Sequence, residues 1–387
     1  MRYLLALVMT VMSVMPSSVT AQPSDGVSVV EAGDPTQRAA TADRRGPTSA
    51  LYRHVPVTTA QPFVFVPADG SCCTRPEDGV GLADGAIVVG DRDRGLRHIS
   101  PDRATSRPFG RLPSDALVNG VSRDKHGLLI VTDIGGRVFE VDPETEETRT
   151  LFANPVPAVL NDAVRTADGR IWVSLSTSGP LLDAILQPLP DGAIWRIDPT
   201  GTLREGRYTY DGAQAVVVAD RLMFANGLLL DDDEAHLYWA ETTGNVIMKA
   251  PIGPGGRLGL AVVFAQIPFG GDNLAMDVEG NVYFANDWLT GVWAVNPAGV
   301  VFPIVDFRWA KTPLLIRGWA DATATPADRL RLLEPNKRPP QFPRVSSTPI
   351  FVDEGRWLCL GTYETDLDPA HFNQLPCMPA PVRGRMR

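Results

Sequence analysis

The sequence predicts an all-β fold, and within that class a six-bladed β-propeller, on three observations. The 387 residues include 35 glycines and 34 prolines, and no long stretch has helical periodicity, which indicates many turns and short strands. Turn glycines recur at positions 85, 127 and 169, and later copies of the pattern follow longer insertions at 280 and 355. A period of about 40 to 50 residues with several strands per unit is typical of a propeller.

Each copy of the repeat contains a turn with Asp-Gly or an equivalent, an apolar strand, a short polar turn and a second strand. The apolar runs AIVVGD, RIWVSL, HLYWAE and NVYFAN mark four of these copies. Six copies imply six blades, and because one blade cannot bury its faces alone, the ring must close. The apolar run FVFVP precedes the first copy, and we expect it to complete the last blade. A β-sandwich with coincidental spacing is the alternative.

The N-terminal residues resemble a secretory signal peptide. Arg2 supplies a positive start, Leu4 to Met15 form a short apolar core, and Val19-Thr20-Ala21 is a small-residue cleavage site. The apolar core is too short to span a bilayer, although an uncleaved anchor is the alternative. We therefore expect a secreted or periplasmic protein whose mature chain has no stable membrane insertion.

The remaining chain divides into a linker and one large domain. Residues 22–60 are polar and form the expected linker, and 61–377 form the expected propeller. Two insertions, near 179–192 and 306–345, are expected at one rim, where they can cover a site. Within the second insertion, Pro326 to Leu333 is expected to form a short helix. The formal charge of −9 argues against a nucleic-acid surface, and it leaves the oligomeric state open.

Export permits disulfides, and the chain has four cysteines, Cys72, Cys73, Cys359 and Cys377. Four cysteines allow three full pairings, which sequence alone cannot distinguish. Adjacent cysteines rarely bond each other, because the geometry is strained. We expect at least one bridge from the N-terminal pair to the C-terminal pair. A zinc site is disfavoured, because there is no CxxC spacing and no nearby pair of histidines.

Four short stretches each place an acid or an amide in an expected turn ahead of a strand-like run. A closed ring would bring these turns to one point, where oxygen ligands suit a hard cation such as calcium. Any one such dipeptide alone is more often a plain turn, but four in register favour a metal site. The stretches are Pro76-Glu77-Asp78-Gly79, Leu160-Asn161-Asp162-Ala163, Phe224-Ala225-Asn226-Gly227 and Gly271-Asp272-Asn273-Leu274.

The order of these stretches resembles the calcium-dependent six-bladed propellers. That family includes gluconolactonase, senescence marker protein, luciferin-regenerating enzyme, the paraoxonases and the strictosidine-synthase-like proteins. The resemblance covers roughly residues 75–300, and it departs from the paraoxonases at Asn119, where that group carries a histidine. It implies a central divalent cation, with Ca²⁺ expected and Zn²⁺ or Mn²⁺ as alternatives. It implies central-cation ligands at Glu77, Asn161, Asn226, Asp272 and Asn273, and a second, structural cation at Asp78 and Asp162.

The resemblance and the chemistry together favour an exported metal-dependent hydrolase that opens a lactone or related ester, a small-molecule substrate. A cation at the channel mouth can polarise the carbonyl, and a nearby carboxylate can orient or deprotonate water. Asp272 is the expected catalytic carboxylate, and Asn161 and Asn119 are expected to bind substrate. One alternative is a strictosidine-synthase-like condensation or cyclisation enzyme, which needs a carboxylate base in the last blade, where Glu364 lies. The other alternative is a non-enzymatic binding propeller stabilised by calcium.

Overall fold

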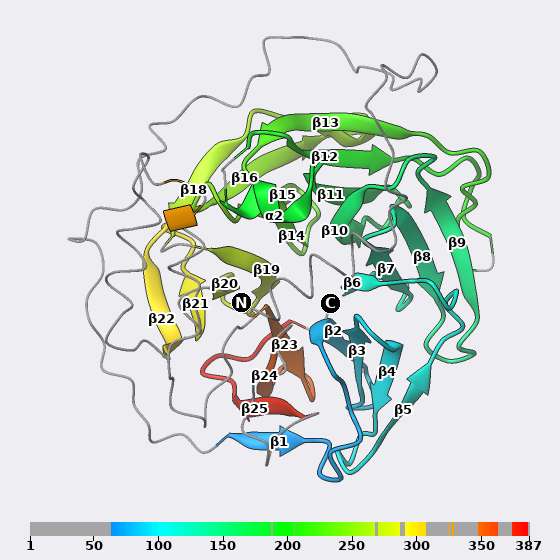
Figure 1. Cartoon of the computed structure of the whole chain (residues 1–387), viewed down its shortest axis with the longest axis vertical. Helices are drawn as coiled ribbons and strands as arrows, with labels where there is room; N and C mark the ends of the chain where they lie inside the picture. Colours follow the sequence, from blue (N-terminus) through cyan, green and yellow to red (C-terminus); the bar gives the residue numbers. More distant parts are fainter. Residues whose placement is uncertain are drawn as a thin grey trace.

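The computed structural model confirms the propeller: six antiparallel sheets surround one central axis (Figure 1). The predicted signal peptide and linker, Glu364 and most of the second insertion lie outside the residues that the structure describes. Of the helix expected from Pro326 to Leu333, only Ala327 and Asp328 are described, and both are helical. The described residues are 63–186, 189–204, 206–267, 270–286, 291–306, 325, 327–328, 347–362 and 374–385.

Each of the first three blades is a four-stranded meander whose first strand lies nearest the axis (Figure 1). The first insertion contains a short helix, α2 (Leu181–Leu186), between two strands of the third blade. The strands are β2 (Pro76–Gly81), β3 (Ile87–Asp91), β4 (Gly95–Ile99) and β5 (Ser106–Phe109); β6 (Val118–Arg123), β7 (Leu129–Asp133), β8 (Arg137–Val141) and β9 (Thr148–Ala153); and β10 (Val159–Arg165), β11 (Ile171–Thr177), β12 (Gly192–Ile197) and β13 (Ala215–Leu222).

The last three blades follow the same plan, and the fourth gains a fifth strand beside the 3₁₀ helix η2 (Pro254–Gly256). Within the described ranges, no helix combines the length and the apolar composition that a membrane crossing requires. The strands are β14 (Ala225–Leu230), β15 (His236–Glu241), β16 (Val246–Gly253), β17 (Arg257–Leu258) and β18 (Val262–Gln266); β19 (Gly271–Met276), β20 (Val282–Asn286), β21 (Gly291–Val295) and β22 (Val301–Asp306); and β23 (Thr348–Val352), β24 (Trp357–Gly361), β25 (Leu375–Pro379) and β1 (Val64–Val66).

The apolar runs that marked the repeat form the second strand of each blade rather than the innermost one. Strands β3 and β20 are buried along their whole length, because neighbouring blades cover both faces. The core accordingly lies between blades: Val88 of β3 and Val131 of β7 belong to one buried cluster, and Ile130 of β7 and Val173 of β11 belong to the next. Continuous apolar runs are what such doubly covered strands require.

Ring closure joins the two ends of the described chain in one sheet. Strand β1 pairs antiparallel with β25, so that Val64 lies opposite Cys377 and Val66 lies opposite Leu375. The expectation that the first apolar run completes the last blade is therefore confirmed.

The expected bridge between the N-terminal and C-terminal cysteines is wrong. Cys72 bonds to Cys73, and Cys359 bonds to Cys377. All four lie in one buried cluster, so the expected proximity is right but the pairing is not. Cys359 and Cys377 are direct partners in the register of β24 and β25, with Cα atoms 3.9 Å apart. Hydrogen bonds between β1 and β25, and no covalent bond, therefore close the ring.

Placing a charge on the closing strand tests this closure. Val66 is 1% exposed, whereas Val64, two residues earlier at the start of β1, is 45% exposed. The Val66→Asp variant should lose about 3 kcal/mol of unfolding free energy in urea titrations, because the carboxylate is buried without a partner. The Val64→Asp control should change stability by less than about 0.5 kcal/mol. Equal effects of the two substitutions would contradict closure by β1.

Candidate functional site

The acid and amide residues lie inside the innermost strands, not in turns ahead of them as expected. Each of the four stretches contains an irregularity in the pairing with the second strand: between Pro76 and Asp78, Leu160 and Ala163, Ala225 and Leu228, and Gly271 and Leu274. A bulge opposes two residues to one on the partner strand and re-aims their side chains. Sequence reasoning singled out these stretches but assigned them the wrong local structure.

Glycine in these stretches permits close approach of neighbouring blades rather than a turn. A Cβ atom on Gly227 would lie 2.4 Å from the Cα atom of Asn273 in the next innermost strand. A Cβ atom on Gly120 would lie 2.5 Å from the carbonyl oxygen of Asn161. The pairs Asn119-Gly120 and Asn226-Gly227 therefore combine a buried amide with the smallest residue at a blade junction.

Three asparagine amides are held in one orientation by hydroxyl groups. In each, the Nδ2 group donates to a Ser or Thr side chain, which fixes where the amide oxygen points. The Oδ1 atoms of Asn226 and Asn273 are buried and have no hydrogen-bond partner within the described residues. A buried polar atom left in this state costs about 1 to 3 kcal/mol, so a ligand there would recover stability. The three bonds join Asn161 to Ser176 (3.1 Å), Asn226 to Thr242 (2.9 Å) and Asn273 to Thr348 (2.7 Å).

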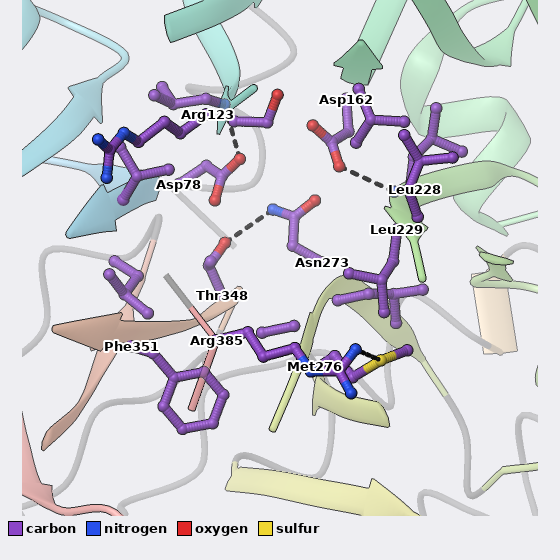
Figure 2. Close-up of a pocket in the computed structure, with 18 of the residues that line it drawn as sticks. Asp78, Arg123, Asp162, Leu228, Leu229, Asn273, Met276, Thr348, Phe351 and Arg385 are labelled. Atoms are coloured by element: carbon purple, nitrogen blue, oxygen red, sulfur yellow. Dashed lines mark hydrogen bonds between the residues drawn. The ribbon is translucent and has the colours of Figure 1, made fainter. Parts of the chain in front are cut away.

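Two buried carboxylates, Asp78 and Asp162, face a common space with the amide of Asn273 (Figure 2). Burial raises the pKa of Asp78 well above its ordinary value, and the negative charge of Asp162 raises it further. Burial also raises the pKa of Asp162 to about 7, and the charge of Asp272 adds to the shift. The ionised form of both carboxyl groups is therefore disfavoured here, and a bound cation would favour it by offsetting the cost of burial and the repulsion.

Backbone amides oppose this repulsion and link successive blades. Asp78 accepts from the N–H of Val121 at 2.7 Å, and Asp162 accepts from the N–H of Leu228 at 2.8 Å. Each of these bonds runs from one innermost strand to the next. The two carboxylates therefore hold the blades together whether or not they also contact a cation.

Glu77, the first expected cation ligand, forms an ion pair with Arg92. The same guanidinium donates to the Oδ1 atom of Asn119, whose Nδ2 group donates to the carbonyl of Leu160 at 2.9 Å. Both ends of the Asn119 amide thus have protein partners, and its role in substrate binding stays a prediction. Arg92 itself was missed. The only signal for it in the sequence is a charged residue directly after the apolar run AIVVGD.

A cavity extends along the axis from the level of Asp78, Asp162 and Asn273 toward the C-terminal ends of the innermost strands (Figure 2). At its far end lies Arg385, whose backbone N–H donates to the carbonyl of Met276 at 2.9 Å and whose guanidinium pairs with Asp232 at 2.9 Å.

The donor set fits a hard cation, although not as a cluster of acids. Among the described residues, no three His, Cys, Asp or Glu side chains are arranged to hold a metal ion, so a cation here would need amide oxygens as well as carboxylates. The buried amide oxygens of Asn226 and Asn273 meet that need. Asp272 adds a carboxylate from β19, the innermost strand of the blade after the one that carries Asn226. Oxygen-only donors of this kind are those that Ca²⁺ takes.

The fold and the axial oxygen donors define a class, the six-bladed propellers with a polar site on the central axis. The chain belongs to the family described as SMP-30/Gluconolactonase/LRE-like region, which its residues 96–315 match. The resemblance drawn from the four stretches is therefore confirmed.

Two curated relatives come from Arabidopsis thaliana. The chain is 25% identical to strictosidine synthase-like 10 over 60% of its own length and 59% of that protein. It is 25% identical to strictosidine synthase-like 7 over 46% of each chain. The chain thus spans about half to three fifths of the length of these relatives.

Solved structures share the fold at low identity. A calcium-binding regucalcin from Agrobacterium tumefaciens superimposes with a TM-score of 0.56 and 15% identity, over 84% of this chain and 97% of that one. A gluconolactonase from Xanthomonas campestris gives a TM-score of 0.53 and 17% identity, over 86% and 98%.

The tight junction at Gly227 gives a direct test of how the site is assembled. Gly227→Ala should lose about 2 kcal/mol of unfolding free energy in urea, because the new Cβ atom meets backbone that cannot move aside. The control is Gly253→Ala, where the nearest atom to the new Cβ is 3.5 Å away and φ is −89°; it should be neutral within about 0.5 kcal/mol. If Gly227→Ala were equally neutral, innermost strands β14 and β19 would not meet as closely as described here.

Proposed function

We propose that this protein is a metal-dependent hydrolase of the gluconolactonase type, which opens a lactone or related ester on the propeller axis. The observation that carries the proposal is the pair of buried amide oxygens, Asn226 Oδ1 and Asn273 Oδ1, which have no hydrogen-bond partner in the described chain. Asn273 follows Asp272 directly on β19, and Asn226 lies on β14, which is hydrogen-bonded to Asp162 of β10. Each amide therefore has a carboxylate on its own or on a neighbouring innermost strand. Family membership supports lactone chemistry at the level of the family.

The ligands proposed for the central cation are Glu77, Asn161, Asn226, Asp272 and Asn273. When bound, a divalent cation would polarise the substrate carbonyl and stabilise the charge that develops on its oxygen. Ca²⁺ suits an all-oxygen donor set, and Mn²⁺ and Zn²⁺ are the alternatives. We also propose that Asp78 and Asp162 hold a second, structural cation, because burial and mutual repulsion raise the pKa of Asp78, and a cation would remove that repulsion.

The chain's own groups supply the rest of the chemistry. Asp272 is proposed to hold the attacking water and to accept its proton, which needs a carboxylate within hydrogen-bond reach of that water. Asn161 is kept in place by its bond to Ser176 and is proposed to position the substrate as well as the cation. The buried surroundings of these side chains limit access of bulk water, which strengthens each polar contact in the site.

Export is proposed from residues 1–21, and the disulfides are compatible with it. A condensation or cyclisation activity is the second candidate, favoured by the similarity to strictosidine synthase-like proteins. It would need a carboxylate base in the last blade and no metal. A calcium-stabilised binding propeller is the non-enzymatic alternative.

Replacing Asp272 tests the hydrolase directly. Asp272→Ala should lower metal-dependent turnover across a panel of lactones and aryl esters at least about 100-fold, because it removes the water-orienting carboxylate. The control is Glu279→Ala, an exposed acid in the outer turn of the same blade, which should keep full activity. Unchanged turnover in a folded Asp272→Ala protein would contradict the proposal that Asp272 is the catalytic carboxylate.

Chelation separates the three candidate functions in the same assay. EDTA should abolish hydrolysis, and added Ca²⁺, Mn²⁺ or Zn²⁺ should restore it. A purely structural ion predicts a lower melting temperature with no hydrolysis of any panel member. A metal-independent condensation enzyme predicts no hydrolysis of any panel member and a melting temperature that EDTA does not change.

A further inference from the structure

Arg92 is a buried cation that the proposed function does not use. It follows strand β3 directly, in a turn that Asp91 fixes by accepting the backbone N–H groups of Thr74 at 2.7 Å and Asp93 at 3.1 Å. The backbone N–H of Arg92 donates to the carbonyl of Arg75 at 3.2 Å. The turn thus directs the guanidinium toward the axis, where Arg92 is buried.

The guanidinium reaches two side chains of the axial site with one nitrogen. Its Nη2 atom pairs with the carboxylate of Glu77 and donates to the amide oxygen of Asn119. Both acceptors are themselves held: the carbonyl of Glu77 accepts from the hydroxyl of Thr348 at 2.7 Å, and Asn119 donates to Leu160 at 2.9 Å. The contact is therefore built into the blade junctions rather than made by a loose surface arginine.

We propose that Arg92 is a tethered competitor of the divalent cation for Glu77. This inference rests on the proposed function, because it concerns the same ligand set. One buried carboxylate cannot be fully shared by a guanidinium and a divalent ion, since two positive charges repel strongly in a site that excludes water. A cation that binds Glu77 must therefore displace Arg92 from it. Arg92 stabilises the metal-free site and weakens metal binding by the same contact.

Calcium titration of the whole mature protein measures this competition. Isothermal titration with Ca²⁺ should give a dissociation constant at least about tenfold lower for Arg92→Met than for wild type, because the metal no longer has to displace a charge. Arg356→Met is the control: it removes one positive charge from an exposed ion pair with Asp353, outside the channel, and should leave the constant unchanged.

The Glu77→Gln background separates competition from a general loss of positive charge. There, adding Arg92→Met should no longer tighten Ca²⁺ binding, because the contested carboxylate is gone. If the tightening persisted, direct competition would be wrong. Melting temperatures give a second readout: without calcium, Arg92→Met should melt below wild type, since Glu77 is left buried and unpaired, and it should gain more on adding Ca²⁺.

The outcomes distinguish this inference from the proposed function. Equal Ca²⁺ dissociation constants for wild type and Arg92→Met would contradict the competition, but they would still support the metal site. No binding by either would overturn both. Binding by Arg92→Met alone would support the competition and contradict metal dependence of the wild-type enzyme. Should Arg92→Met fail to fold, Arg92→Lys takes its place; its shorter side chain cannot keep both contacts, so its constant should fall between the two, and a constant equal to wild type would refute the competition.

Discussion

The structure depends on one recurring constraint, the polar contact that ties each blade to the next around the axis. Asp78 accepts from Val121, and Asp162 accepts from Leu228. The other junctions use hydroxyl or amide donors on backbone carbonyls, and the last of them returns to the first blade. These bonds run from Thr132 to Asn161, Thr242 to Gly271, Asn273 to Ser347 and Thr348 to Glu77.

This constraint explains why the axis is rich in oxygen atoms. Apolar side chains fill the spaces between blades, whereas the innermost strands meet at bulges, where backbone groups need polar partners. Short acids and amides satisfy those groups, and the amide oxygens of Asn226 and Asn273 are left without a hydrogen-bond partner among the described residues. The same residues thus join the blades and are the ones proposed to supply the donors for a cation. The cost is the burial of carboxylates close to one another: burial, and then the charge of a neighbouring carboxylate, raises the pKa of Asp78 and Asp162, whereas Glu77 is paired with Arg92.

Much of this arrangement could be predicted from the sequence, since the period of the turn glycines and the apolar runs determine the blade count and locate a buried strand in the blades, although not its place as the second strand. The local structure of the innermost strands was harder to predict from the sequence. Asn226-Gly227 has the composition of a turn, but the glycine is required because Asn273 of the next blade lies against it. The predicted cysteine pairing was also wrong, because Cys359 and Cys377 become neighbours only through the pairing of β24 with β25. Arg92 could not be assigned, since nothing local distinguishes it from the other arginines of its turn.

We propose that oxygen atoms near the propeller axis hold a divalent cation. A crystal structure of the mature protein grown with Ca²⁺ tests it most directly. Anomalous density is expected on the axis, with the oxygens of Asn226, Asn273 and Asp272 within about 2.3 to 2.6 Å of the ion and Arg92 moved off Glu77. A channel without such density, in which Arg92 still pairs with Glu77 at saturating calcium, would contradict it.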